Sequence, residues 1–199
     1  VYKIYASAPP NLTVTNSDNT LDNVQHVSLA GTDVLVSIDD SMGGGGVYVK
    51  NAALTNLGNV TGFPAHQTVY DGTQYAYSIE GNSNDADTMR IIDLADRDNP
   101  SVISTFGLTD QNAQSIAYKS GHIYVTQFDT SGSPQKKLLK IFSVANPTAP
   151  SLVSQINLSQ QASDIGFDGD FVYLGSGDGV AIIYAEDLAN PFPYGTMEV

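Results

Sequence analysis

The sequence contains no cysteine and no tryptophan, and only 8 of its 199 residues are lysine or arginine. Without cysteine, neither a disulfide nor a thiolate metal site can form. No apolar run approaches the ~18 residues that a membrane helix needs, so membrane insertion is not expected. The 21 acidic residues give a net charge of −13. This charge argues against binding to nucleic acid, whose phosphates require clusters of basic side chains.

An apolar pair followed by a proline recurs along the chain. The clearest copies begin at Ile91, Ile141 and Ile182, and each reaches an Asn-Pro pair a few residues later. Weaker copies begin at Ile4 and Tyr48. In chain order these five positions are 44, 43, 50 and 41 residues apart. A period of this length is typical of the blade of a β-propeller.

A second pattern lies between these copies, in which two runs of apolar, aromatic or β-branched residues flank a glycine. Two such runs around a glycine turn predict a β-hairpin. No stretch keeps the 3.6-residue periodicity of an amphipathic helix, so we expect almost no helix. The four predicted hairpins are Val27–Val36, Val69–Tyr77, Ile116–Val125 and Ile165–Leu174.

The two patterns together predict an all-β chain, a β-propeller built from about four four-stranded blades plus a partial blade. In each repeat, strand a precedes the glycine turn and strand b follows it, strand c carries the apolar pair, and strand d follows the proline. The expected segments are 1–16 for the partial blade and 24–62, 65–106, 113–157 and 162–199 for the blades. A half-blade has no partner in a four-blade ring. We therefore expect the chain to belong to a larger propeller, or its end blades to pack against those of neighbouring copies.

The stretches Ile91–Ile103 and Ile141–Val153 resemble the LVIVD repeat, a propeller repeat of bacterial and archaeal surface and secreted proteins. The shared motif is an apolar strand, an Asp or Ser, an Asn-Pro turn and a second apolar strand. The hairpin Gly121–Val125 is also similar to that family. The resemblance covers nearly the whole chain, with specific motifs in two copies. It implies a propeller fold and an extracellular or cell-surface protein, with the periplasm as the alternative location, and it supplies no catalytic residues.

The b–c and d–a connections of a propeller emerge at the same end, and here the b–c loops differ between copies. Loops that escape the packing constraint of a repeat are where function is placed, so this end is the candidate binding face. The b–c loops also carry carboxylates, the hard oxygen ligands that calcium prefers. The alternative is a set of solvated polar loops. Any calcium site is expected to use Asp39, Asp40, Glu80, Asp85, Asp87 and Asp129.

Polar residues recur just before or at the start of strand a, which lines the central channel. In an alignment of the copies, His26 shares its position with Gln67, Ser115 and Asp164, and His66 falls in the neighbouring position. A ring of such side chains at the channel mouth can hold a metal or a small ligand. The alternative is hydrogen bonding to water in the channel.

No sequence motif indicates a nucleophile, a phosphate-binding loop or a catalytic acid–base pair. The sequence therefore favours a non-catalytic extracellular or cell-surface scaffold, adhesion or assembly module, with either no cofactor or calcium. Its expected partners are other proteins or copies of itself. The alternative is a propeller enzyme of the metal-dependent hydrolase or lactonase type with a site at the channel mouth, because propellers host many unrelated functions.

Overall fold

The computed structural model describes residues 2–8, 11–17, 21–39, 45–81 and 87–198. Every regular element among them is a β-strand, so the prediction of an all-β chain is confirmed. None of the described residues forms a helix that could cross a membrane. The strands are β1 (Tyr2–Ala8), β2 (Asn11–Ser17), β3 (Val24–Ala30), β4 (Asp33–Ile38), β5 (Gly46–Lys50), β6 (Asn56–Thr61), β7 (Gln67–Tyr70), β8 (Tyr75–Ile79), β9 (Thr88–Asp93), β10 (Ser101–Gly107), β11 (Ala113–Lys119), β12 (His122–Asp129), β13 (Lys136–Ser143), β14 (Ser151–Asn157), β15 (Asp164–Asp168), β16 (Phe171–Ser176), β17 (Gly179–Tyr184) and β18 (Phe192–Glu198).

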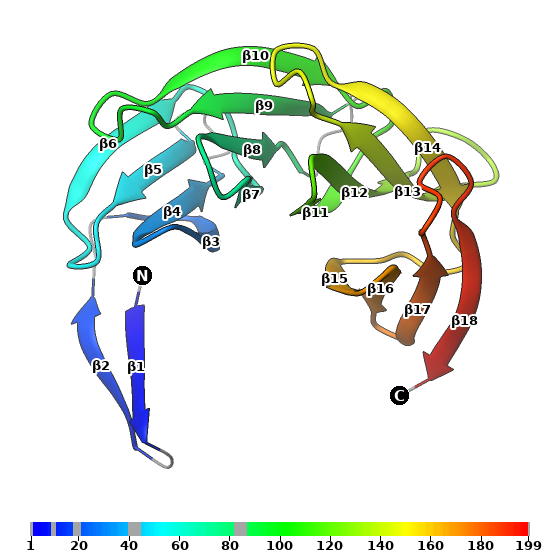
Figure 1. Cartoon of the computed structure of the whole chain (residues 1–199), viewed down its shortest axis with the longest axis horizontal. Helices are drawn as coiled ribbons and strands as arrows, with labels where there is room; N and C mark the ends of the chain where they lie inside the picture. Colours follow the sequence, from blue (N-terminus) through cyan, green and yellow to red (C-terminus); the bar gives the residue numbers. More distant parts are fainter. Residues whose placement is uncertain (1, 9–10, 18–20, 40–44, 82–86, 199) are drawn as a thin grey trace.

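Sixteen of these strands form four antiparallel sheets, each with four strands in chain order. We call them sheet 1 (β3–β6), sheet 2 (β7–β10), sheet 3 (β11–β14) and sheet 4 (β15–β18). β1 and β2 form a separate two-stranded sheet. The four sheets follow an arc, with β3, β7, β11 and β15 on its inner side and β6, β10, β14 and β18 along its rim (Figure 1). The fold is therefore β-propeller-like, and the strand order within each sheet is the predicted a-b-c-d.

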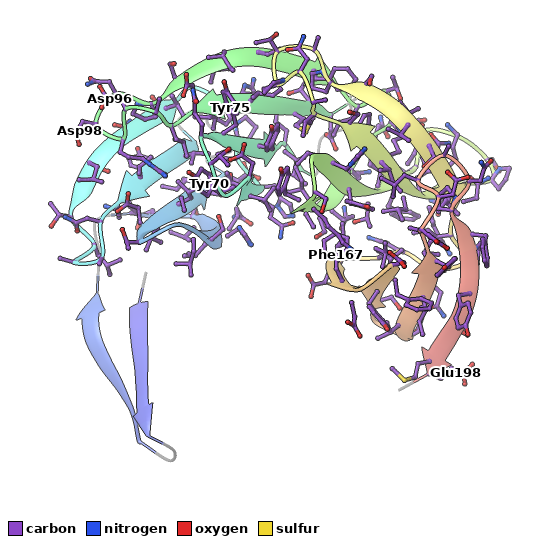
Figure 2. The ribbon with its side chains drawn as sticks, viewed as in Figure 1. Tyr70, Tyr75, Asp96, Asp98, Phe167 and Glu198 are labelled. Carbon is purple, nitrogen blue, oxygen red and sulfur yellow. The ribbon has the colours of Figure 1, made fainter. Side chains whose placement is uncertain are left out.

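The central strands of the inner sheets are buried on both faces because each sheet lies between two others. In β12, Ile123 and Val125 pack in the core shared with sheet 2, whereas Tyr124 packs in the core shared with sheet 4. The ring of Tyr124 meets the edge of Phe167 of β15, with centroids 4.9 Å apart. Figure 2 shows Phe167 on the inner side of the arc. The apolar runs of the repeat thus build the contacts between sheets.

Buried hydroxyl groups also join sheets 1 and 2. Ser37 Oγ donates to Thr68 Oγ1 at 2.7 Å, and Thr68 Oγ1 donates to Ser78 Oγ at 3.0 Å. All three side chains are buried. Because an unpaired buried hydroxyl is costly, this chain of hydrogen bonds helps to fix how the two sheets face each other.

The strand register corrects one detail of the repeat. Val49 pairs with Leu35 on the face of sheet 1 that meets sheet 2. This position corresponds to Ile91 in sheet 2, which pairs with Tyr77 on the face toward sheet 3. Tyr48, which the spacing pattern aligned with Ile91, packs on the opposite face of its sheet. A slip of one residue reverses the face in a strand, so the apolar pair alone did not determine the register.

Candidate functional site

The channel mouth contains a hydrogen-bonded connection through three neighbouring sheets. Gln67, at the start of β7, has its Nε2 atom 3.2 Å from Nε2 of His26 in β3. The Oε1 atom of Gln67 accepts from the backbone nitrogen of Ile116 in β11 at 2.8 Å. The sequence placed His26 and Gln67 in the same ring, and the structure brings them into contact.

Burial and two titratable neighbours, His66 and Asp164, act on the pKa of His26. Burial of the imidazole lowers its pKa most, and the nearby His66 lowers it further, whereas the carboxylate of Asp164 opposes them. Desolvation disfavours the imidazolium form of His26, and positive charge nearby does the same, whereas a nearby carboxylate favours it. Because its pKa lies below the ordinary 6.5, His26 is mainly neutral at pH 7. One ring nitrogen can then accept a hydrogen bond or bind a metal, while the other carries a proton.

The other two members of the predicted ring lie apart from this pair. Ser115 is buried, and its Oγ has no hydrogen-bond partner among the residues that the structure describes. Asp164 is exposed, and its Oδ1 accepts from the backbone nitrogen of Ile165 at 2.9 Å. Direct contact in the ring is therefore found for His26 and Gln67, while Asp164 acts through its charge.

Three of the six candidate calcium ligands, Glu80, Asp87 and Asp129, use their carboxylates in protein contacts. Glu80 forms an ion pair with Arg90 of β9. Asp87 is buried and its carboxylate accepts from the backbone nitrogen of Ala113 in sheet 3. These two carboxylates hold strands and sheets together, which is a structural role that the loop sequence did not reveal.

Asp129 also has protein partners. It accepts from both the backbone nitrogen and the hydroxyl of Ser131, at 2.9 and 2.6 Å, and Lys136 lies 3.1 Å away. These hydrogen bonds, those from Ser131 first, hold the pKa of the Asp129 carboxyl well below its ordinary value. Asp39 donates its backbone N–H to Asn23 O, and Asp40 and Asp85 lie outside the described residues. Within the described part of the chain, no three His, Asp or Glu residues gather closely enough to hold a metal ion.

A polar cavity of about 460 Å³ lies between sheets 3 and 4, at the end where the b–c loops emerge. The β12–β13 loop, the β14–β15 connection and the β16–β17 turn all contribute to it. Sequence reasoning selected this end of the molecule but overlooked the residues of the cavity, because it looked for carboxylates and histidines. The cavity is lined by, among others, the side chains of Phe128, Gln135, Lys137, Gln160, Gln161 and Asp178.

Comparison by sequence finds no matching family model and no matching curated protein. Solved structures do match. A protein of unknown function from Desulfotomaculum acetoxidans superposes with a TM-score of 0.70 at 16% identity, over 94% of this chain and 59% of that one. A hypothetical selenium-binding protein from Sulfolobus tokodaii superposes with a TM-score of 0.72 at 12% identity, over 100% of this chain and 56% of that one. A variant of the Synechocystis apocarotenoid oxygenase superposes with a TM-score of 0.50 at 12% identity, over 96% of this chain and 55% of that one.

At these identities the similarity concerns the fold alone. The chain spans somewhat more than half the length of each of these three structures. They support the β-propeller-like architecture and leave the function to be argued from the chain's own residues.

Proposed function

We propose that this chain is part of a larger β-propeller that acts as a non-catalytic scaffold, adhesion or assembly module at the cell surface or outside the cell. The observation that carries the proposal is the outward face of sheet 4. This face repeats, position by position, a face that is buried in sheet 3.

The strand register defines the two equivalent faces. In sheet 3, Tyr124 pairs with Ile141, and Leu139 pairs with Ile156. All four pack in the core shared with sheet 4. The same positions of sheet 4 are filled by Tyr173 and Ile182, which pair with each other, and by Val180 and Met197, which also pair.

The residues on these two faces are similarly apolar but differ in how much of each side chain is exposed. Ile156 is 9% exposed, whereas Met197 at the equivalent position is 57% exposed. Aromatic rings extend the outward face, since Phe171 contacts both Tyr184 and Tyr194, with centroids 5.2 and 5.1 Å apart. A contiguous apolar face of this kind on a soluble protein indicates an interaction surface.

We assign this face to a further blade of the same propeller. Sheet 4 covers Tyr124 of sheet 3 with Ile165 and Phe167 of its inner strand. A following blade with apolar residues at those two positions would cover Tyr173 in the same way. The longer solved structures, which match 94% and 100% of this chain with little more than half of their own length, support such a continuation.

The two-stranded sheet β1–β2 supports the same proposal. Among the described residues it has two strands where the other sheets have four. Because its strands are expected to be c and d of a blade, the missing strands would be a and b. A larger ring closes when such strands are supplied from elsewhere in the propeller.

Introducing a negative charge on the outward face tests the assembly role. In residues 1–199 alone, we expect the end faces to be covered by other copies, so the chain should associate as its concentration rises. Met197→Glu should weaken this association. Leu152→Glu is the matched control, because Leu152 is 53% exposed but lies on β14 of an inner sheet. Analytical ultracentrifugation showing equal association of the two variants would contradict the proposal.

One observation favours a second candidate, a metal-dependent enzyme with its site at the channel mouth. The ring nitrogens Nδ1 of His26 and His66 are both buried without a hydrogen-bond partner among the described residues, and His66 is close enough to lower the pKa of His26. Elemental analysis of the purified chain separates the candidates. A stoichiometric transition metal that is present in the wild-type chain and lost in His66→Ala would favour the enzyme. A wild-type chain that holds no metal after incubation with excess transition metal would favour the scaffold.

A further inference from the structure

We infer that the cavity between sheets 3 and 4 binds a neutral carbohydrate. This inference rests on the proposed binding role and names a ligand class for the b–c loop end. Its volume of about 460 Å³ lies within the usual range of small-molecule sites. Both of its walls belong to this chain, so the site is complete without a further blade.

Two adjacent glutamines give the cavity fixed donors and acceptors. Ser176 Oγ lies 2.9 Å from Oε1 of Gln160 and 3.1 Å from the carbonyl oxygen of Gly179, and its one proton is shared between these two acceptors. The contact uses the carbonyl oxygen of Gln160, so the amide N–H groups of Gln160 remain for a ligand. Nε2 of Gln161 donates to Gln114 Oε1 at 3.2 Å, which leaves the carbonyl oxygen of Gln161 as an acceptor. A ligand that both donates and accepts suits this pair, and each hydroxyl group of a sugar does both.

The charges of the cavity select a neutral ligand. Lys137 and Asp178 line it with one charge of each sign. Lys137 already donates to the carbonyl oxygen of Ser159 at 3.0 Å, so its ammonium is partly engaged. A single cation on a chain of net charge −13 is a weak site for an anion. The ammonium of Lys137 and the carboxylate of Asp178 instead offer a further donor and a further acceptor for hydroxyl groups.

Phe128 adds apolar surface to this polar lining. It is half-buried near the end of β12 and lines the cavity. Carbohydrate rings have a face of C–H groups that packs on apolar side chains, while their hydroxyl groups point outward. The combination of one aromatic residue with amide and carboxylate groups therefore fits a sugar better than it fits a purely polar metabolite.

Titration of the isotope-labelled 199-residue chain by ¹H–¹⁵N NMR tests the inference. The probes are maltotriose, cellotriose, mannotriose and N,N′,N″-triacetylchitotriose, with trigalacturonate and the glucosamine trimer as anionic and cationic comparisons. We expect at least one neutral trisaccharide to shift the amide signals of Gly177 and Asp178, which line the cavity. The absence of shifts with all four neutral sugars, or stronger binding of a charged trimer, would overturn the inference.

Two variants give the matched comparison. Gln160→Ala should weaken binding of the neutral trisaccharide roughly tenfold, as expected when a hydrogen-bonding side chain is removed. Asp168→Ala, an exposed position of the same sheet that does not line the cavity, should leave binding unchanged. Equal loss in both variants would contradict the site. Sugar binding by a chain that stays monomeric would retain this inference while removing the assembly proposal.

Discussion

Lys140 of β13 crosses to the connection after β10, where its Nζ atom lies 2.5 Å from Oδ2 of Asp110. Only 1% of the lysine side chain is exposed. Its ammonium also donates to the carbonyl oxygen of Leu108 and, at 3.0 Å, to the hydroxyl of Thr109. The buried charge is thus surrounded by three acceptors in the β10–β11 connection, and it ties β13 of sheet 3 to the segment that leads out of sheet 2.

Removing this charge should destabilise the chain strongly. Lys140→Met keeps the length of the side chain but leaves the Asp110 carboxylate without its buried partner. We expect a loss of about 3 kcal/mol in the free energy of unfolding, measured by urea denaturation. Lys136→Met is the control, because Lys136 binds the other oxygen of Asp110 at 2.8 Å but is half exposed, and its loss should be much smaller. Comparable losses in the free energy of unfolding for the two variants would contradict the importance of burying the Lys140 ammonium.

Gly58 of β6 gives a test of packing between neighbouring sheets. A Cβ atom at this position would lie 2.5 Å from Cδ of Pro100 and 2.6 Å from the carbonyl oxygen of Asp98, in the turn after β9. Because the turn backbone cannot yield easily, Gly58→Ala should cost about 1–3 kcal/mol. Gly107→Ala meets no atom within 4 Å and should be nearly neutral. Thermal unfolding of the two variants should separate them, and equal melting temperatures would refute the close contact.

The proline turns are held by carboxylates that titrate in acid. Asp187 accepts from the backbone nitrogen of Ala189 and from the Asn190 amide, and Asp96 makes the same pair of contacts in its own turn, at the rim in Figure 2. The amide of the asparagine, first of all, lowers the pKa of each carboxyl below its ordinary value of 3.8.

Stability from these carboxylates should be present above pH 3.8 and lost as the pH falls through the lowered pKa. Asp187→Ala should therefore lower the melting temperature at pH 7. At the acid end of the titration, where wild type has lost the same interaction, the difference should shrink. Melting curves at a series of pH values measure both effects, and a difference that does not change with pH would argue against the carboxylate.

His26 should produce a separate pH dependence. Its pKa in the folded chain lies below the ordinary 6.5, so the unfolded chain takes up a proton first as the pH falls. The stability that neutral His26 contributes is present above pH 6.5 and is lost toward the lower folded pKa. His26→Gln should flatten the stability profile in this window. An NMR titration that finds a His26 pKa above 6.5, despite His66 beside it, would contradict the buried neutral imidazole.

The fold was largely predictable because similar strand and turn patterns recur along the sequence. The glycine turns around Gly31, Gly121 and Gly169 and the proline turns marked which runs pair, and each hairpin lies where the pattern placed it. The register at Tyr48 was the exception. Both Tyr48 and Val49 are apolar, and since the strand is buried on both faces, the pattern does not distinguish its two faces.

The candidate site was less predictable because its contacts join residues far apart in the sequence. The alignment of repeats found His26 and Gln67, which occupy equivalent positions in adjacent sheets. It gave no signal that Asp87 would accept a hydrogen bond from sheet 3, or that Gln160 would be held by Ser176. Such partnerships depend on how neighbouring sheets face each other, and a loop's own sequence does not encode them.

Light scattering of residues 1–199 after gel filtration tests most directly whether sheet 4 ends in a face that requires a further blade. If Tyr173, Ile182 and Met197 form such a face, the chain should elute with a mass above 21.1 kDa that rises with concentration. A folded, monodisperse particle of 21.1 kDa at every concentration, with full β-sheet circular dichroism, would contradict it.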